Sequence, residues 1–145
     1  MLQEKSCGAV IFLKQDGQTK YLLLSYSANH WDFVKGGVEP NENEKETVIR
    51  ELKEETGISD AQFIDGFREL IEYYYRRKGL TVHKVVVLYL METHSEAVKL
   101  SFEHRGYVWL DFEGAAKRLS FKNEKDVLNK AHAFLIDKGI AKNCP

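Results

Sequence analysis

The chain has 145 residues, of which 43% are hydrophobic, and its formal net charge is −1. This length supports one hydrophobic core and leaves no room for a second domain of ordinary size, so we expect a single domain over residues 1–145. The near-neutral charge provides no overall positive field, which disfavours a nucleic acid partner. Any recognition of phosphate must therefore come from positively charged groups gathered at one place on the protein.

The start of the chain predicts a strand and a turn rather than a targeting segment. Residues 1–13 include an apolar stretch without a small-residue cleavage site, and a polar turn follows directly. No apolar run approaches membrane-spanning length, and Cys7 and Cys144 do not make a disulfide framework. These features predict a cytoplasmic protein that does not use a membrane.

Strands dominate the first third of the chain. Residues 7–13 and 20–27 flank the turn at 15–19 and predict a hairpin. Residues 31–34 predict a short strand that leads to a pair of glycines.

The segment from Gly36 to Ile58 contains a helix with defined ends. Asn43 with Glu46, or equally Asn41 with Glu44, has the pattern of a capped start, and Gly57 is placed to end the helix. At 100° per residue one side of this helix, predicted to pack inward, carries Val48, Ile49 and Leu52.

The neighbouring arc of the same helix gathers the carboxylates of Glu44, Glu51, Glu54 and Glu55. Like charges this close are unfavourable unless a cation is present, and oxygen-rich clusters suit hard divalent cations, so Mg²⁺ or Mn²⁺ is the expected cofactor. A solvated acidic helix face is the ordinary alternative. Arg50, four residues before Glu54 and four after Glu46, could orient a ligand carboxylate.

The rest of the chain alternates between predicted strands and predicted helices. Strands are expected at residues 61–67, 70–77, 82–93 and 106–110, with a turn near 78–79, and helices at 113–119 and 124–137. In the run from Tyr73 to Tyr75 alternate side chains point to opposite faces, and one face is expected to pack in the core. The pattern predicts an α/β or α+β sandwich with a mixed sheet between helices.

The segment 36–58 resembles the signature of the Nudix hydrolases. Its matching residues are Gly36, Glu42, Arg50, Glu51, Leu52, Glu54, Glu55, Gly57 and Ile58. The resemblance implies an α/β/α fold, and it implies hydrolysis of a nucleoside diphosphate linked to another group by water that attacks phosphorus. It also implies that the metal ligands are Glu51, Glu54, Glu55 and the carbonyl of Lys35.

Outside this signature, the resemblance extends over nearly the whole chain to the asymmetrical diadenosine tetraphosphate hydrolases, whose small-molecule substrate is split into ATP and AMP. It implies that His30 touches the phosphate chain, that Tyr73 stacks on adenine and that Glu103 adds a metal ligand with a catalytic role. Phe121 is a candidate for the opposite face of the base. Lys35 and Lys84 are candidates to bind phosphate.

Each of these residues also has an ordinary structural explanation. His30 could be a solvated turn residue, Glu103 a loop carboxylate, and the basic groups surface charge. The chain also departs from the family pattern, with Val34 in place of a proline and Asn41 in place of a glycine. The substrate could instead be a damaged nucleoside triphosphate or an RNA 5′ end, and a sensor that binds a nucleotide without hydrolysing it is the third possibility.

Overall fold

The computed structural model describes residues 1–27 and 29–142. Within these residues eight strands form one sheet. Their bounds are β1 (Leu2–Gln15), β2 (Gln18–Ser27), β3 (His30–Asp32), β4 (Val34–Gly37), β5 (Gln62–Phe63), β6 (Glu69–Arg77), β7 (Leu80–Glu92) and β8 (Gly106–Leu110). The predicted strands are present, although β1 begins five residues earlier than the apolar pattern indicates and β5 is shorter. The single strand predicted at 31–34 is wrong in one respect: it is divided at Phe33 into β3 and β4.

The centre of the sheet is a long parallel pair. β1 and β7 run parallel from the pair Leu2 and Val82 to the pair Phe12 and Glu92, and the other pairings are antiparallel. β2 and β4 also pair with β1, β3 and β8 pair with β2, and β5 and β6 pair with β7. The predicted mixed sheet is therefore confirmed.

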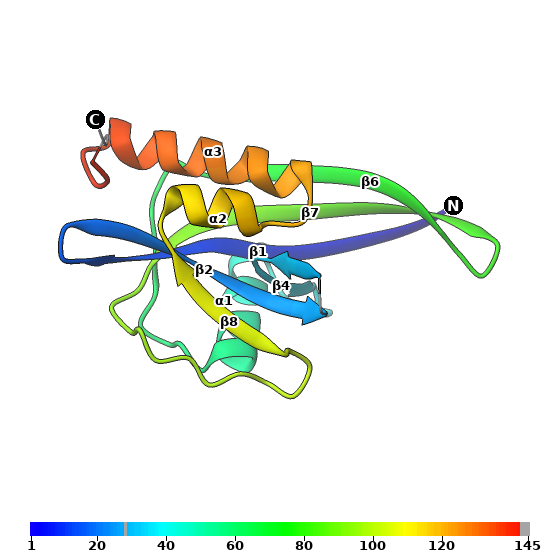
Figure 1. Cartoon of the computed structure of the whole chain (residues 1–145). Helices are drawn as coiled ribbons and strands as arrows, with labels where there is room; N and C mark the ends of the chain where they lie inside the picture. The colour runs from blue at the N-terminus through cyan, green and yellow to red at the C-terminus, as the bar shows by residue number, and fades with distance from the viewer. Residues whose placement is uncertain (28, 143–145) are drawn as a thin grey trace.

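Helices cover both faces of this sheet. α1 (Glu44–Thr56) lies on one face, and α2 (Phe112–Arg118) and α3 (Lys122–Asp137) lie on the other, as Figure 1 shows. Alternate residues of β1 enter different cores: Cys7, Ala9 and Ile11 pack on the α1 side, whereas Val10 and Phe12 pack towards α2 and α3. The expected α/β/α arrangement is confirmed.

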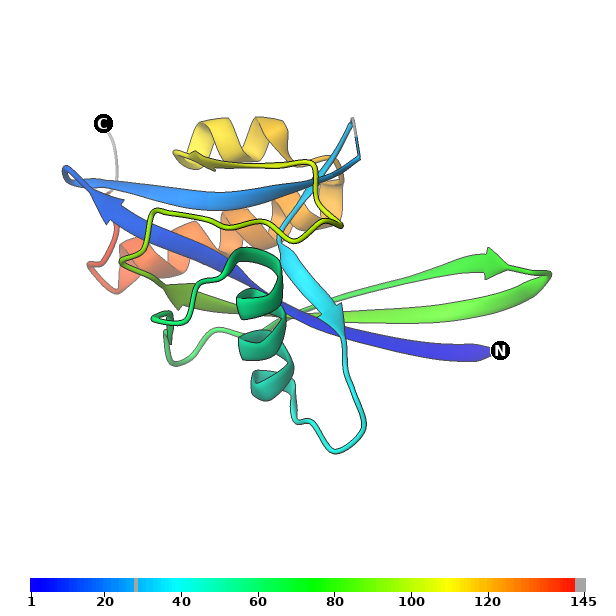
Figure 2. The same ribbon diagram turned by 90° about the horizontal axis from the view of Figure 1, so that it is seen from below.

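The sheet extends beyond the helices at one end. The hairpin of β6 and β7 and the start of β1 reach past the end of α3, most clearly in the view of Figure 2. Tyr73 is 40% exposed and Tyr74 is 60% exposed. The prediction that one face of the tyrosine run packs in the core is therefore wrong for Tyr73 and Tyr74.

The start of α1 decides between the two predicted caps. Asn43 is the N-cap: its side chain accepts a hydrogen bond from the backbone N–H of Glu46, whose carboxylate accepts one from the N–H of Asn43. Gly57 ends the helix with φ 75°. Ile49 is 53% exposed, so its predicted inward packing is wrong; only Val48 and Leu52 of that set are buried.

Three further features of the chain bear on the predictions. Asn41, at the position where the family pattern has glycine, has φ 69°, a conformation that glycine adopts without strain. Cys7 is buried and free, and Cys144 lies outside the described residues. No described helix combines the length and the apolar composition needed to cross a membrane.

Candidate active site

The loop that precedes α1 is pressed against the carboxylate of Glu51. A Cβ atom built on Gly36 would lie 2.0 Å from Cδ of Glu51, so only glycine fits at this position. β4 holds the loop by pairing Gly36 with Cys7 and Lys35 with Gly8 of β1. The backbone beside Lys35 and the Glu51 side chain are therefore brought together, as the metal prediction requires.

Arg50 organises the acidic side chains around it. Its guanidinium donates to Glu42 at 2.5 and 3.0 Å, to Glu51 at 2.9 Å and to Glu54 at 3.2 Å. It also donates to the carbonyl of Gly37 at 2.9 Å, which ties the loop to the helix. The hydrogen bonds that Glu42 accepts, from Arg50 first and then from the N–H of Glu39 and the hydroxyl of Thr47, lower the pKa of Glu42 to about 2. Glu46, four residues before Arg50, is used in the helix cap instead.

Glu55 differs from the other helix carboxylates because it is 4% exposed. Its Oε1 accepts a hydrogen bond from Tyr26 at 3.4 Å and lies 3.2 Å from Nε2 of His104, at angles unsuited to a hydrogen bond. Its Oε2 is buried without a partner. Burial and the neighbouring Glu51 raise the pKa of Glu55 to about 10. Glu55 therefore does not belong to a solvated acidic face of α1.

Glu44 is also separate from the acidic cluster. Its carboxylate pairs with Lys5 at 2.7 Å and Arg68 at 2.9 Å, and it accepts a hydrogen bond from Tyr89 at 2.6 Å. These contacts lower its pKa, with the hydrogen bond from Arg68 as the largest cause. Glu44 therefore already has counter-charges and is not needed as a metal ligand.

The chemistry of the remaining donors fits a hard divalent cation. A buried carboxyl oxygen of Glu55 lacks a partner, and the neighbouring carboxylate of Glu51 helps to raise the pKa of Glu55, so a cation would stabilise both groups. In the described part of the chain no three acidic, His or Cys side chains converge as a complete metal site. Arg50 donates to both Glu51 and Glu54, so a cation bound there would compete with the guanidinium for these two carboxylates.

Glu103 lies on the loop that approaches the end of α1. The backbone N–H groups of Lys99 and Ser101 donate to the carbonyls of Thr56 and Glu55, at 2.8 and 3.2 Å. Glu103 is exposed, and its charge contributes to the raised pKa of Glu55. The structure thus brings Glu103 towards Glu51 and Glu55.

A cavity of about 310 Å³ lies on the face of the sheet that carries α3. Its lining includes four of the five predicted substrate-binding residues, His30, Lys35, Tyr73 and Phe121. The rings of His30 and Phe121 meet edge to face, with their centroids 5.1 Å apart. Lys84, the fifth, does not line the cavity; it pairs with Tyr73 across β6 and β7 and lies 3.7 Å from Glu4.

Asp32, Asn123 and Glu124 complete the lining of this cavity. Asp32 is 1% exposed, and its Oδ2 lies 2.9 Å from Nζ of Lys35 and 3.6 Å from Nε2 of His30. Burial opposes ionisation of Asp32, but the neighbouring His30 and the charge of Lys35 outweigh it and lower the pKa of Asp32. Burial and the nearby Asp32 raise the pKa of Glu124 to about 7.

The two halves of the site meet at Lys35. Its side chain enters the cavity with the aromatic residues, whereas its backbone belongs to the loop that is packed against Glu51. An apolar cleft, cations and a carboxylate cluster are thus held side by side by one short strand, β4. This arrangement can bind an aromatic group at one end and a polyphosphate at the other.

The profile of the NUDIX domain matches residues 5–131. This chain belongs to the Nudix family. The asymmetrical bis(5′-nucleosyl)-tetraphosphatase of Mus musculus is 39% identical over 143 residues, which cover 90% of this chain and 95% of the mouse protein. The protein of that name from Caenorhabditis elegans is 35% identical over 136 residues, covering 90% of this chain and 96% of the relative.

A solved structure agrees with these relatives. The crystal structure of a C. elegans Ap4A hydrolase binary complex has a TM-score of 0.78 and 32% identity, and the match covers 92% of this chain and 98% of that chain. The Nudix fold therefore extends over nearly all of this protein.

Sequence reasoning missed several residues of this Nudix site. They are Tyr26, Asp32, His104 and Glu124. Two of these residues could have been found from the sequence. Asp32 stands two residues after His30 on a strand and so shares its face, and His104 directly follows Glu103. Glu124 had no such signal, because only the packing of α3 against the sheet brings it to Asp32.

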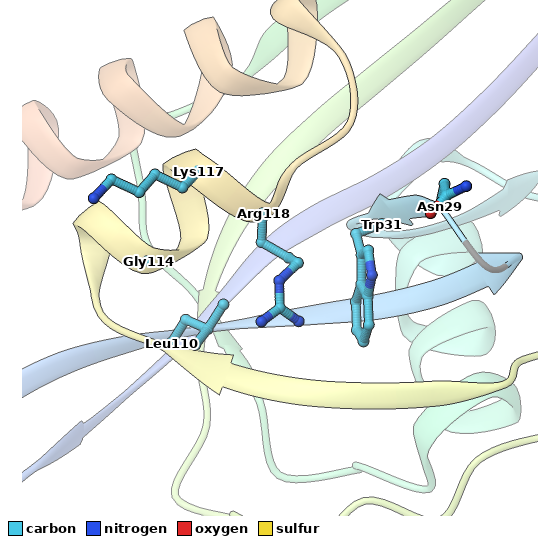
Figure 3. A pocket seen from close by; sticks show the side chains of 6 residues that line it. All are labelled: Asn29, Trp31, Leu110, Gly114, Lys117 and Arg118. Carbon is cyan, nitrogen blue, oxygen red and sulfur yellow. The ribbon is translucent and has the colours of Figure 1, made fainter.

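A second hollow of this Nudix protein, about 460 Å³, lies beside α2 (Figure 3). It is lined by Asn29, Trp31, Leu110, Gly114, Lys117 and Arg118. The guanidinium of Arg118 faces the Trp31 ring, with its Cζ 5.0 Å from the ring centroid. The lining provides none of the carboxylates that the chemistry needs, so the cavity beside α3 is the better candidate.

Proposed function

We propose that this Nudix protein is a divalent-metal-dependent hydrolase that splits diadenosine tetraphosphate asymmetrically into ATP and AMP. Water adds across one P–O–P anhydride bond, so that one product keeps three phosphates and the other keeps one. The names of the mouse and C. elegans relatives support this substrate.

One observation carries the proposal: Lys35 joins the aromatic cavity to the carboxylate cluster. A nucleoside in the cavity between Tyr73 and Phe121 would direct its phosphates past His30 and Lys35 towards Glu51 and Glu55. Base stacking on an aromatic ring contributes about 1–3 kcal/mol, and charge-assisted bonds from Lys and His suit phosphate oxygens.

The residues that would hold Mg²⁺ or Mn²⁺ are Glu51, Glu54, Glu55, Glu103 and the carbonyl of Lys35. A bound cation of this kind supplies a lower pKa for the attacking water and neutralises charge on the phosphate chain. The protein positions the substrate: the cavity fixes the base, and Lys35 and His30 orient the phosphates. Arg50 positions Glu51 and Glu54 through its hydrogen bonds.

A substrate panel with product analysis tests this function. The purified protein with MgCl₂ is given diadenosine tetraphosphate, 8-oxo-dGTP and a 5′-triphosphorylated RNA, and the products are separated by chromatography. We expect ATP and AMP in equal amounts from the first substrate and the highest kcat/KM for it. Formation of two ADP molecules, or faster hydrolysis of either other substrate, would contradict the proposal.

A further inference from the structure

Phe102 is the most exposed of the large hydrophobic side chains that the structure describes, with 97% of its surface open to solvent. Aromatic side chains normally bury a large apolar area, and a ring left in water contributes little to folding. A single exposed hydrophobic residue is common, so the place of this ring matters more than its exposure. Phe102 directly precedes Glu103, which is proposed to bind the metal.

Phe102 and Glu103 form the tip of a tight turn. The backbone N–H of His104 donates to the carbonyl of Ser101 at 3.2 Å, so Phe102 and Glu103 are the two central residues of a β-turn. The hydroxyl of Ser101 also lies 3.0 Å from Nδ1 of His104 and joins the two ends of the turn a second time. The ring and the carboxylate are therefore carried by one closed unit.

The base of this turn is attached to Glu55. The N–H of Ser101 donates to the backbone carbonyl of Glu55 at 3.2 Å, and Nε2 of His104 lies 3.2 Å from the Glu55 carboxylate. On its other side the N–H of Arg105 donates to the carbonyl of Ser25 in β2 at 2.9 Å. The turn is thus anchored at both ends, and its tip is held beside the carboxylates that are proposed to bind the metal.

A row of aromatic rings connects the turn with the cavity beside α3. The ring centroid of Tyr26 lies 5.3 Å from that of His30, which lines the cavity, and 4.5 Å from that of His104. The hydroxyl of Tyr26 also donates to the Glu55 carboxylate at 3.4 Å. A phosphate chain that runs from His30 to Glu55 therefore leads from the cavity towards the turn.

A dinucleoside tetraphosphate has two bases, and the cavity beside α3 accounts for one of them. Its volume of about 310 Å³ is near the lower limit for small-molecule sites, and it provides Tyr73 and Phe121 as aromatic walls. The second nucleoside lies at the other end of the phosphate chain, beyond the carboxylates, where Phe102 exposes its ring. Every nucleobase has a π-face, so stacking there does not depend on which base is present.

We propose that Phe102 stacks on the second nucleobase of the substrate, the one outside the cavity beside α3. The inference rests on the proposed function, because only a dinucleotide has this second base. The ligand of Phe102 is a nucleoside of any base linked to the phosphate chain. The turn then has two roles, since Glu103 faces the metal and Phe102 holds the far end of the substrate.

Two substrates, with and without the second nucleoside, test the inference. Diadenosine tetraphosphate has it, whereas adenosine 5′-tetraphosphate ends in a free phosphate. We expect Phe102→Ala to raise KM for the dinucleotide about 5-fold, the lower limit for base stacking because only one face of the base is covered, and to leave KM for adenosine 5′-tetraphosphate unchanged. The kcat should change little. A wild-type KM for the dinucleotide, or an equal rise for both substrates, would overturn the inference.

Three further variants separate stacking from exposure of an apolar group. Phe102→Tyr keeps the ring and should behave as the wild type, whereas Phe102→Leu is apolar without a ring and should resemble Phe102→Ala. Leu80→Ala, at the start of β7 where Leu80 is 52% exposed, is the matched control and should leave both KM values unchanged. A wild-type KM for the dinucleotide in Phe102→Leu would show that the contact is not stacking, and the inference would be wrong.

Binding without turnover separates the inference from the proposed function. Calorimetry uses an analogue of diadenosine tetraphosphate with methylene bridges between the first and second and between the third and fourth phosphates, and the matching analogue with one adenosine. We expect Phe102→Ala to weaken binding of the first analogue about 5-fold and to leave the second unchanged.

The combined outcomes identify which proposal fails. If Phe102→Ala weakens only the first analogue but the wild-type protein does not hydrolyse diadenosine tetraphosphate, the proposed function is wrong and the role of Phe102 stands. If the wild-type protein forms ATP and AMP but Phe102→Ala binds the first analogue with the wild-type Kd, the function stands and the inference is wrong. Failure of the wild-type protein to bind the first analogue would overturn both.

Discussion

Glu55 combines the features of a metal ligand with those of a buried acid. Its Oε2 has no partner, and Glu51 is its close neighbour. In the absence of a cation this arrangement is unfavourable, since burial and like charge both oppose ionisation. Binding of a cation would remove that cost, and the folded state alone would gain from it.

We therefore expect Glu55→Gln to lower kcat by about 10² to 10⁴. We also expect MgCl₂ or MnCl₂ to raise the Tm of the wild-type protein in a concentration-dependent way and to raise that of the variant less. Steady-state kinetics and thermal melts with and without EDTA measure these effects. Glu46→Gln, at the helix cap, is the control for loss of an acidic side chain. Wild-type turnover by Glu55→Gln in excess magnesium would exclude the metal assignment.

Tyr73 is 40% exposed and lines the cavity, so its loss should affect binding rather than folding. Tyr73→Ala is expected to raise KM for diadenosine tetraphosphate roughly 5-fold to 150-fold, because stacking on a base far from the reacting phosphorus is mainly ground-state binding. The kcat should change much less, and Tyr73→Phe should behave as the wild type.

Tyr74 provides the matched control for Tyr73. It lies on the opposite face of β6, where its ring stacks on His83 with centroids 4.8 Å apart. Tyr74→Ala should leave KM unchanged. If Tyr73→Ala has the same KM as Tyr74→Ala, the cavity does not hold the base.

At the scale of elements, α1 depends on its first turn. The reciprocal hydrogen bonds of Asn43 and Glu46 satisfy two backbone donors that would otherwise lack partners. Asn43→Ala should destabilise the protein by about 1 kcal/mol, with a fall in Tm of about 2–4 °C. Asn43→Ser keeps an acceptor and should lose little. Equal Tm values for the Ala and Ser variants in thermal melts would show that the cap is not used.

The sequence predicted most features of α1, and the predictions that failed did so for physical reasons. The capping pattern and Gly57 predicted both ends, although two overlapping Asn–Glu pairs left the first turn ambiguous until the contacts of Asn43 resolved it. Periodicity assigned Ile49 to the core because it places residues on an arc without indicating how far the neighbouring layer extends. The same limit explains the exposed Tyr74.

The candidate site was predictable where local spacing determines it. Glu51, Glu54 and Arg50 lie within one turn and a half of helix, and the structure keeps them together. Asp32 and Glu124 are 92 residues apart in the chain, and only the packing of α3 beside β3 brings them to the same cavity. No pattern along the chain carries that information.

At the scale of the whole molecule, the core beneath α3 contains a titratable pair. The Nδ1 atom of His132 lies 2.6 Å from the hydroxyl of Tyr21, and the imidazole stacks on Phe112 with centroids 4.2 Å apart. Burial lowers the pKa of His132, so folding favours its neutral form. The stability due to this group is complete above a pH of about 6.5 and falls as the pH drops through the pKa of the folded state.

The part of the free energy of unfolding that His132 contributes, measured with urea between pH 7.5 and 5 as the difference between the wild type and His132→Gln, should therefore decrease as the pH falls. The variant removes this contribution, because its unfolded state no longer gains a proton that the folded state resists. His94→Gln, at an exposed position, should leave the slope as in the wild type. An unchanged slope in His132→Gln would mean that other groups account for the pH dependence.

The parallel pairing of β1 with β7 sets the order in which the molecule can form during translation. Leu2 pairs with Val82 and Phe12 with Glu92, so each partner is synthesised 80 residues after the residue it pairs with. At about 5–20 residues per second this interval lasts roughly 4–16 s. During that time the apolar centre of β1 has β2 and β4 as partners but lacks the strand on its other side. The nascent chain is therefore exposed to strand mispairing until β7 has left the ribosome.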